Sequence, residues 1–121
     1  MSIGGSILAC QIDSVTYTVD SEGDITEMPP KEIEARATSG ETLFKVTKKV
    51  PERQSIDLIV DGVDKQALES LLGTIVAISY TEADGTVNSG QAMLNIDSRT
   101  TQENKMTVNF LPTLAWDVFP A

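Results

Sequence analysis

The chain has 121 residues, of which 40% are hydrophobic and 22% charged, which is typical of one folded domain and excludes wholesale disorder. Its formal net charge of −9 argues against a general affinity for nucleic-acid backbones or anionic membranes, because both would repel it. The absence of histidine excludes Ser-His-Asp and Cys-His catalytic groupings and any imidazole metal ligand.

A single cysteine, Cys10, rules out an intramolecular disulfide and favours a reducing compartment. It follows Ala9 in an apolar stretch, so we expect it to be a small core residue and not a nucleophile. No apolar run approaches the about 20 residues that a membrane-spanning helix needs. These features predict a protein that is made and folded in a cytoplasm.

The first two strands are expected to form a hairpin. Apolar residues alternate over residues 7–12 and again over residues 15–19, but the second set is shifted by one position. A two-residue turn at Asp13-Ser14 explains the shift, because a register change would otherwise expose every apolar side chain. Residues 20–30 then form a loop or irregular edge, since Pro29 and Pro30 cannot donate to a β-ladder.

The next segments combine a charged strand with a basic excursion. Residues 31–38 alternate in the manner of a half-buried strand, with Ile33 and Ala35 toward the core. The opposite face carries Glu32, Glu34 and Arg36. Residues 39–54 are expected to form a long polar loop or hairpin, and they hold four of the nine basic residues of the chain, namely Lys45, Lys48, Lys49 and Arg53.

One helix is expected, over residues 64–72. A strand that buries Ile56, Leu58 and Val60, with Asp57 on its other face, leads into the helix. Asp61 and Asp64 are both acceptable N-caps, and Gly73 can adopt the left-handed conformation just past the helix end. Apolar residues recur along one side of the helix and predict a core-facing stripe, formed by Val63, Ala67, Leu68, Leu71 and Leu72.

The C-terminal half reads as an antiparallel meander. Residues 74–81 are strongly β-prone, and residues 75–78 within them are apolar on both faces, as in a central strand. Asp84-Gly85 is a hairpin signal. Residues 97–105 are expected to be a polar connection. Alternation predicts the inward residues of the remaining strands, which are Ala92, Leu94, Ile96, Met106, Val108, Phe110, Leu114, Trp116 and Val118.

These elements predict a mainly β fold in a single domain over residues 1–121. We expect an antiparallel β-sandwich or partly open β-barrel with one short helix laid against it. One helix cannot cover so many strands, so long sheet edges should remain open, and open edges invite pairing with another chain.

The residues for catalysis are missing. There is no Gly-rich phosphate loop, and the loop at residues 20–24 lacks the ligand pattern of a calcium-binding EF-hand. The carboxylate pairs Glu32/Glu34 and Asp57/Asp61 are most simply solvated strand faces, because acid–base catalysis needs two carboxylates that converge in a cleft. We therefore predict a protein that is not an enzyme and binds no cofactor or metal.

The order of segments resembles that of the small tail tube proteins of Mu-like phages. The similarity begins with the opening strand, tight turn and second strand of residues 7–19. It continues through the proline-containing loop, the charged strand at residues 31–38 and the Ser39-Gly40 break. The strand–helix step at residues 55–72, the Asp84-Gly85 hairpin and the closing meander complete it, so the similarity spans nearly the whole chain.

This resemblance implies a subunit of hexameric rings that stack into a hollow tube, with DNA passing through an acidic lumen. It implies a virion location, in the tail, after assembly in the host cytoplasm. The partners are copies of the chain itself, with a tail sheath, a tape measure protein and a terminator protein beyond them, but neither a membrane nor a specific nucleic-acid sequence. A net charge of −9 suits such a conduit, because the wall would repel its polyanionic cargo.

Particular residues are assigned to these surfaces. Glu32, Glu34, Arg36 and Asp57 are expected to face the lumen, with the outer tube surface as the alternative. Lys45, Lys48, Lys49 and Arg53 are expected to contact an adjacent subunit, because a cationic segment complements an anionic body. The alternative is an ordinary hairpin whose lysines are solvated.

Two other classes of protein remain open at this point. One is a tube protein of the type VI secretion kind or another tail or baseplate component. The other is a monomeric ligand-binding β-sandwich.

Overall fold

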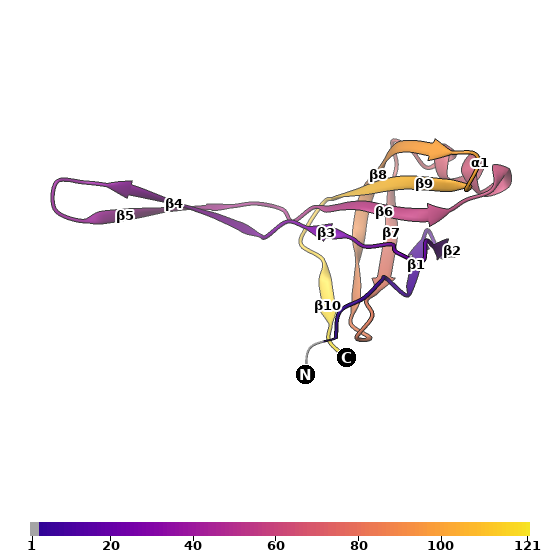
Figure 1. Ribbon diagram of the computed structural model, residues 1–121. Coiled ribbons are helices and arrows are strands. Elements are labelled where there is room, and N and C mark those ends of the chain that lie inside the picture. The colour runs from indigo at the N-terminus through magenta and orange to yellow at the C-terminus, as the bar shows by residue number, and fades with distance from the viewer. Residues whose placement is uncertain (1–2) are drawn as a thin grey trace.

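The computed structural model describes residues 3–121 and consists mainly of antiparallel β-strands with one short helix (Figure 1). The elements in chain order are β1 (Ala9–Ile12), β2 (Val15–Val19), β3 (Thr26–Glu27), β4 (Lys31–Ala37), β5 (Thr42–Lys48), β6 (Arg53–Ile59), α1 (Gly62–Ser70), β7 (Ile75–Thr81), β8 (Val87–Thr100), β9 (Lys105–Pro112) and β10 (Asp117–Phe119). The expected fold class, mainly β with antiparallel sheets and one helix, is confirmed.

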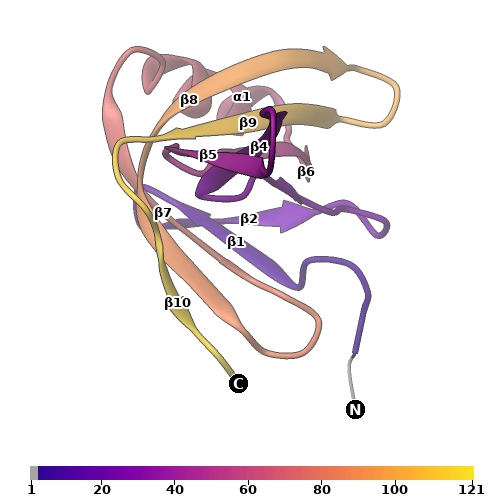
Figure 2. The ribbon, with the colours of Figure 1, turned by 90° about the vertical axis from the view of Figure 1, so that its left-hand side faces the viewer.

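Six of the strands form a ring that is visible in Figure 2. Around it the order is β6, β9, β8, β7, β1 and β2, and β2 pairs again with β6. The seam between β2 and β6 is narrow, because only Thr18 pairs with Ile59 and Val19 with Leu58. The body is therefore a β-barrel joined by a short seam, and we call it the barrel.

The barrel has fewer open edges than the sequence led us to expect. Each of its six strands has two neighbours, and the added strands β3 and β10 are only two and three residues long. Ring closure removes edges that a flat sheet would leave free. The long open edges lie elsewhere, on β4 and β5, which pair only with each other.

Apolar side chains from all six strands fill the barrel. The buried hydrophobic residues are Ile7, Cys10, Ile12, Tyr17, Ile56, Leu58, Val60, Leu68, Val76, Ile78, Tyr80, Ala92, Leu94, Met106, Val108, Phe110 and Trp116. Complete burial of an aliphatic or aromatic side chain contributes roughly 1.5–3 kcal/mol, so this set supplies the main driving force for folding. The expected inward residues of β6 and β9 are confirmed, as is the burial of Cys10, which has no exposed surface. Of the set expected on β8, Ala92 and Leu94 are buried and Ile96 is half-buried.

The first hairpin is confirmed in register and turn. Ile12 pairs with Val15, so Asp13 and Ser14 form a two-residue turn. Both have a positive φ, of 52° and 66°, as a type I′ turn requires. The Asp13 amide also donates to the carbonyl of Ala77 at 2.8 Å, which ties the turn to β7. The other predicted hairpin, between β7 and β8, turns at Gly85 with a φ of 93°.

The helix begins and ends two residues earlier than expected. Asp61 is the N-cap, and its carboxylate accepts a hydrogen bond from the Asp64 amide at 2.9 Å. Its predicted core-facing stripe is mostly wrong. Leu68 is fully buried and Leu71 partly buried, but Val63 is 77% exposed. The members of the expected stripe that pack against the core are Leu68 and Leu71, which both lie at the C-terminal end of the helix.

Two further expectations at the C-terminal end are corrected. Residues 97–100 are not a loop, because β8 continues to Thr100 and only residues 101–104 turn the chain into β9. Leu114 is 74% and Val118 50% exposed, and only Trp116 of that alternating set is buried. Trp116 lies against Gly90, where there is no side chain to exclude it.

Candidate functional site

The strands β4 and β5 form a hairpin that projects away from the barrel (Figure 1). We call residues 31–48 the arm. The pairing runs from Lys31 opposite Lys48 to Ala37 opposite Thr42, and every residue of the arm is exposed. Residues 39–54 were expected to form a long polar loop or hairpin. They comprise the turn and the return strand of this hairpin, a connection over residues 49–52 and the beginning of β6.

One face of the arm is apolar and uncovered. The cross-strand pairs Ile33–Val46 and Ala35–Phe44 lie side by side on it. Ile33 is 66% exposed, Phe44 69% and Val46 55%. The strand at residues 31–38 was expected to be half-buried, and this is wrong for the single chain, because nothing in the described part of the molecule packs against this face.

The other face of the arm is mainly charged. Glu34 lies opposite Lys45, and Arg36 lies opposite Leu43. The pairing of opposite charges across two strands favours the hairpin register. An isolated two-stranded hairpin is at best marginally stable in water, and its stability increases when an apolar face is covered. Covering its apolar face would therefore stabilise the arm.

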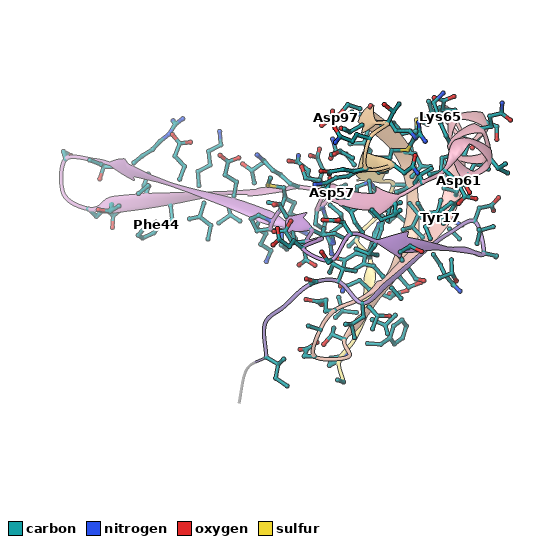
Figure 3. The ribbon with its side chains drawn as sticks, turned by 45° about the vertical axis from the view of Figure 1, so that its right-hand side comes forward. Tyr17, Phe44, Asp57, Asp61, Lys65 and Asp97 are labelled. Carbon is teal, nitrogen blue, oxygen red and sulfur yellow. The ribbon has the colours of Figure 1, made fainter. Side chains whose placement is uncertain are left out.

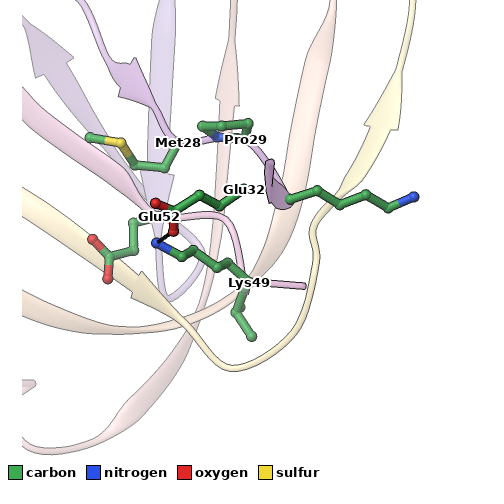
Figure 4. Close-up of a pocket in the computed structure, with 7 residues that line it drawn as sticks. Met28, Pro29, Glu32, Lys49 and Glu52 are labelled. Carbon is green, nitrogen blue, oxygen red and sulfur yellow. Dashed lines mark ion pairs between the residues drawn. The ribbon is translucent and has the colours of Figure 1, made fainter. Parts of the chain in front are cut away.

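The basic residues expected at a subunit interface divide into two groups. Lys45 and Lys48 lie on the arm, and Lys49 follows it directly. Lys49 forms an ion pair with Glu32, which lowers the pKa of the Glu32 carboxyl through a hydrogen bond and charge attraction (Figure 4). Both side chains line a pocket of about 350 Å³ at the arm base, together with Met28, Pro29, Lys31, Val50 and Glu52.

Arg53 does not belong to the exposed basic group. It is only 5% exposed, and its Nε donates to the Tyr80 hydroxyl at 3.0 Å. That hydroxyl in turn donates to the Glu27 carboxylate, and Glu27 lies 3.7 Å from the Arg53 Nε. Burial and the nearby Glu27 carboxylate raise the pKa of Tyr80. Arg53 was expected among the exposed residues of a subunit interface. In the structure it instead belongs to a buried polar cluster, which Glu27, Arg53 and Tyr80 form.

This buried cluster connects the arm to the barrel. Glu27 precedes the arm in the chain, Arg53 follows it, and Tyr80 belongs to the barrel strand β7. The Arg53 guanidinium lies over the Trp116 ring at 5.4 Å from its centroid, an arrangement that favours cation–π attraction. Both ends of the arm are therefore held against the barrel by one set of contacts.

The residues expected to face the lumen are divided between the arm and the barrel. Glu32, Glu34 and Arg36 lie on the arm, whereas Asp57 lies on the outer side of β6. Figure 3 shows Asp57 on the barrel and Phe44 far along the arm. Asp57 accepts from the Thr107 hydroxyl at 2.7 Å and lies 3.7 Å from the Lys105 ammonium. Within one subunit these residues do not form a common wall.

A second apolar surface lies on the outside of the barrel, and sequence reasoning missed it. Ile75, Met93 and Leu111 stand opposite one another in adjacent positions across β7, β8 and β9. They are 54%, 37% and 41% exposed. The sequence signal for Ile75 is the apolar run at residues 75–78, whose pattern predicts a strand that is covered on both faces. Only the face with Val76 and Ile78 is covered.

Among residues 3–121 no group of three or more acidic, cysteine or histidine side chains is placed to hold a metal ion. No helix of the described chain is long and apolar enough to cross a membrane. The surfaces that stand out are the apolar face of the arm and the outer row on the barrel.

Known protein families, curated proteins and solved structures were compared with this chain, and none of them matches it.

Proposed function

We propose that this protein is a structural subunit of a phage tail tube, assembling with copies of itself into stacked, hexameric rings whose lumen conducts DNA. The observation that carries the proposal is the projecting arm with its uncovered apolar face. A rigid body with an exposed apolar extension is suited to contact a neighbouring copy. The order of segments, which resembles that of Mu-like tail tube proteins, supplies the specific assignment.

The arm would work by covering its apolar face with an adjacent subunit. Such a contact joins one surface of a copy to a different surface of the next, and contacts of this type generate rings or filaments. The outer row of Ile75, Met93 and Leu111 is an apolar surface of the kind that the arm needs. Exposed apolar surfaces on soluble proteins commonly mark such interaction sites.

Charge supports the same arrangement. Residues 31–49 hold five of the nine basic residues but only three of the eighteen acidic ones. The remainder of the chain is strongly acidic, so the arm of one copy is attracted to the body of another. The acidic body also suits a conduit that must not retain DNA, because like charges repel along the lumen.

The tail tube assignment carries partners and a location with it. Besides further copies of the chain, a tail sheath, a tape measure protein and a terminator protein would contact the tube, and the mature protein would reside in the virion. A type VI secretion-like tube would use the same self-association. The arm favours either tube over a monomeric ligand-binding sandwich, because a monomer has no use for an uncovered extension.

Electron microscopy of negatively stained protein tests the proposal. Concentrated, purified protein should form rings or short tubes, and light scattering should show a mass that grows with concentration. Assembled tubes should not retain added DNA at physiological salt. A mass that stays at 13.0 kDa at every concentration and salt would overturn the proposal.

A further inference from the structure

Two buried N–H groups, on Arg53 and Trp116, lie where the arm joins the barrel and have no hydrogen-bond acceptor among the described residues. Among the described residues, the Arg53 Nη1 and the Trp116 Nε1 have neither solvent access nor a hydrogen-bond acceptor. Arg53 is 5% and Trp116 7% exposed. Nearly all buried polar groups in folded proteins are satisfied, so two unpaired donors in contact with one another's side chains require an explanation.

A pocket lies directly over this pair of residues. It has a volume of about 390 Å³, and Arg53 and Trp116 line it together with Glu27 and the apolar residues Met28 and Pro51. Neither nitrogen has solvent access, so an acceptor that enters the pocket must displace a neighbouring side chain to reach them. Met28 is 38% exposed and unbranched, and a flexible side chain of this kind can make room at small cost.

We propose that this pocket receives the Glu41 carboxylate at the arm tip of a second copy of the chain. A carboxylate accepts several hydrogen bonds at once and matches a guanidinium in charge and shape. It would accept from the Arg53 Nη1 and the Trp116 Nε1 together. The contact goes beyond the tube assignment, because it requires a second copy but no particular assembly.

The choice of Glu41 follows from the arm. Its three carboxylates are those of Glu32, Glu34 and Glu41. Glu32 is paired with Lys49, and Glu34 lies opposite Lys45. Glu41 lies in the tip turn, which its backbone closes by hydrogen bonds with Thr38 at 2.7–3.2 Å. The carboxylate itself has no partner among residues 3–121.

Geometry directs this carboxylate to another copy. Seven residues in each strand, at about 3.3 Å per residue, place the tip roughly 20 Å or more from the base of its own arm. Glu41 therefore cannot enter the pocket of its own chain. A tip that binds the base of the next arm makes a head-to-tail contact, which repeats from copy to copy.

A double-mutant cycle tests the contact in the full chain. The variants are Glu41→Gln, Arg53→Lys and their combination, and the measured quantity is the concentration at which half of the protein is assembled. Each single change should raise it about tenfold. The double variant should raise it no further than the larger single change, because both remove the same interaction. Additive effects of the two changes would overturn the proposal.

The control is Glu103→Gln, which neutralises an exposed carboxylate in another hairpin turn and should assemble like the wild type. Glu41→Gln is itself at an exposed tip, so its folding is not at risk, and Arg53→Lys is checked by circular dichroism. If Glu41→Gln assembles at the wild-type concentration, the proposal is wrong, whatever the behaviour of Arg53→Lys.

A second measurement keeps this inference separate from the tube assignment. Trp116 is the only tryptophan, so its emission reports on the pocket directly. An end-blocked peptide of residues 38–42 should shift the emission of the unassembled wild-type chain in a saturable way, and the peptide carrying Glu41→Gln should not. If the protein never assembles, the tube proposal fails while this titration still decides the pocket. Equal responses to the two peptides would overturn the pocket proposal and leave the tube proposal standing.

Discussion

Phe44 lies directly opposite Ala35 on the apolar face of the arm, with 69% of its surface exposed. The large ring therefore projects beside a small side chain, and no residue among 3–121 covers it. Burial of such a ring against a partner would contribute roughly 1.5–3 kcal/mol. The arm therefore offers a way to measure self-association without disturbing the barrel.

Replacement of Phe44 by glutamine should block assembly but spare the fold. The free energy of unfolding of the monomer should change by less than about 0.5 kcal/mol, because the side chain is exposed. The concentration at half assembly should rise at least about tenfold, as expected for the loss of one buried aromatic anchor. Light scattering measures the second quantity and urea unfolding the first.

Leu43→Gln is the matched control for this change. Leu43 is the neighbouring residue, is 53% exposed, and lies on the charged face of the same arm. It should assemble more nearly like the wild type. Equal losses from the two variants would show that the apolar face is not the contact surface.

Charge reversal by Lys48→Glu with Lys49→Glu should weaken assembly while circular dichroism remains unchanged. Lys48 lies opposite Lys31, so its reversal removes a like-charge pair within the arm, whereas reversal of Lys49 breaks its ion pair with Glu32. Both sites are exposed, and such ion pairs contribute little to folding. The reversed arm would repel the acidic body of the next subunit, and high salt should mimic part of the effect.

Reversing the charge of one lysine outside the arm tests whether assembly depends on the arm itself or only on the net charge of the protein. The matched pair is Lys48→Glu alone and Lys65→Glu, which change the total charge equally; Lys65 lies on α1, away from the arm, and its reversal is the control. Its assembly should stay closer to that of the wild type. Tubes that form normally from the Lys48→Glu, Lys49→Glu protein would refute the electrostatic role of the arm.

Gly90→Ala should destabilise the barrel. A Cβ at position 90 would lie 2.6 Å from two ring atoms of Trp116, so the indole or the strand must shift. Overpacking of this kind costs about 1–3 kcal/mol. The control is Gly40→Ala in the arm turn, where a Cβ would meet nothing within 4 Å, and its free energy of unfolding should stay near the wild-type value. Urea unfolding followed by Trp116 emission measures both, and equal stabilities would contradict this packing.

The stability of the protein should fall at alkaline pH, partly because of Cys10. Burial raises the pKa of its thiol from 9.0 to about 12, so above pH 9 the unfolded chain loses a proton that the native chain retains. The contribution of the protonated Cys10 thiol to the free energy of unfolding is fully present below pH 9 and is lost as the pH rises toward 12. Between pH 8 and pH 10 the loss should reach about 1.4 kcal/mol.

The Cys10→Ala protein isolates this contribution. Tyr17 and Tyr80 also have raised pKa values, mainly because burial disfavours their charged forms, so both proteins should lose stability at alkaline pH. The variant should therefore lose less stability than the wild type between pH 8 and pH 10. If the free energies of unfolding of the two proteins, measured in urea, fall in parallel with pH, the Cys10 thiol does not cause the alkaline loss of stability.

The sequence by itself determined the local elements of the barrel. The shift in alternation at Asp13-Ser14 predicted the first hairpin, and the Asp84-Gly85 signal predicted another. The alternation of Met106, Val108 and Phe110 identified the buried side of β9. These features are local, since turn geometry and the two-residue period of a strand depend only on neighbouring residues.

Only the tertiary structure decided which apolar faces are covered. Ile33 and Ala35 alternate with charged residues just as barrel residues do, yet their strand, β4, pairs with β5 in the arm and is not part of the barrel. The sequence places Arg53 in an exposed basic segment, but in the structure it is buried and donates to the hydroxyl of Tyr80, which is 27 residues away. A periodic pattern shows that a face needs cover, but the folded chain, or a second copy of it, determines what provides that cover.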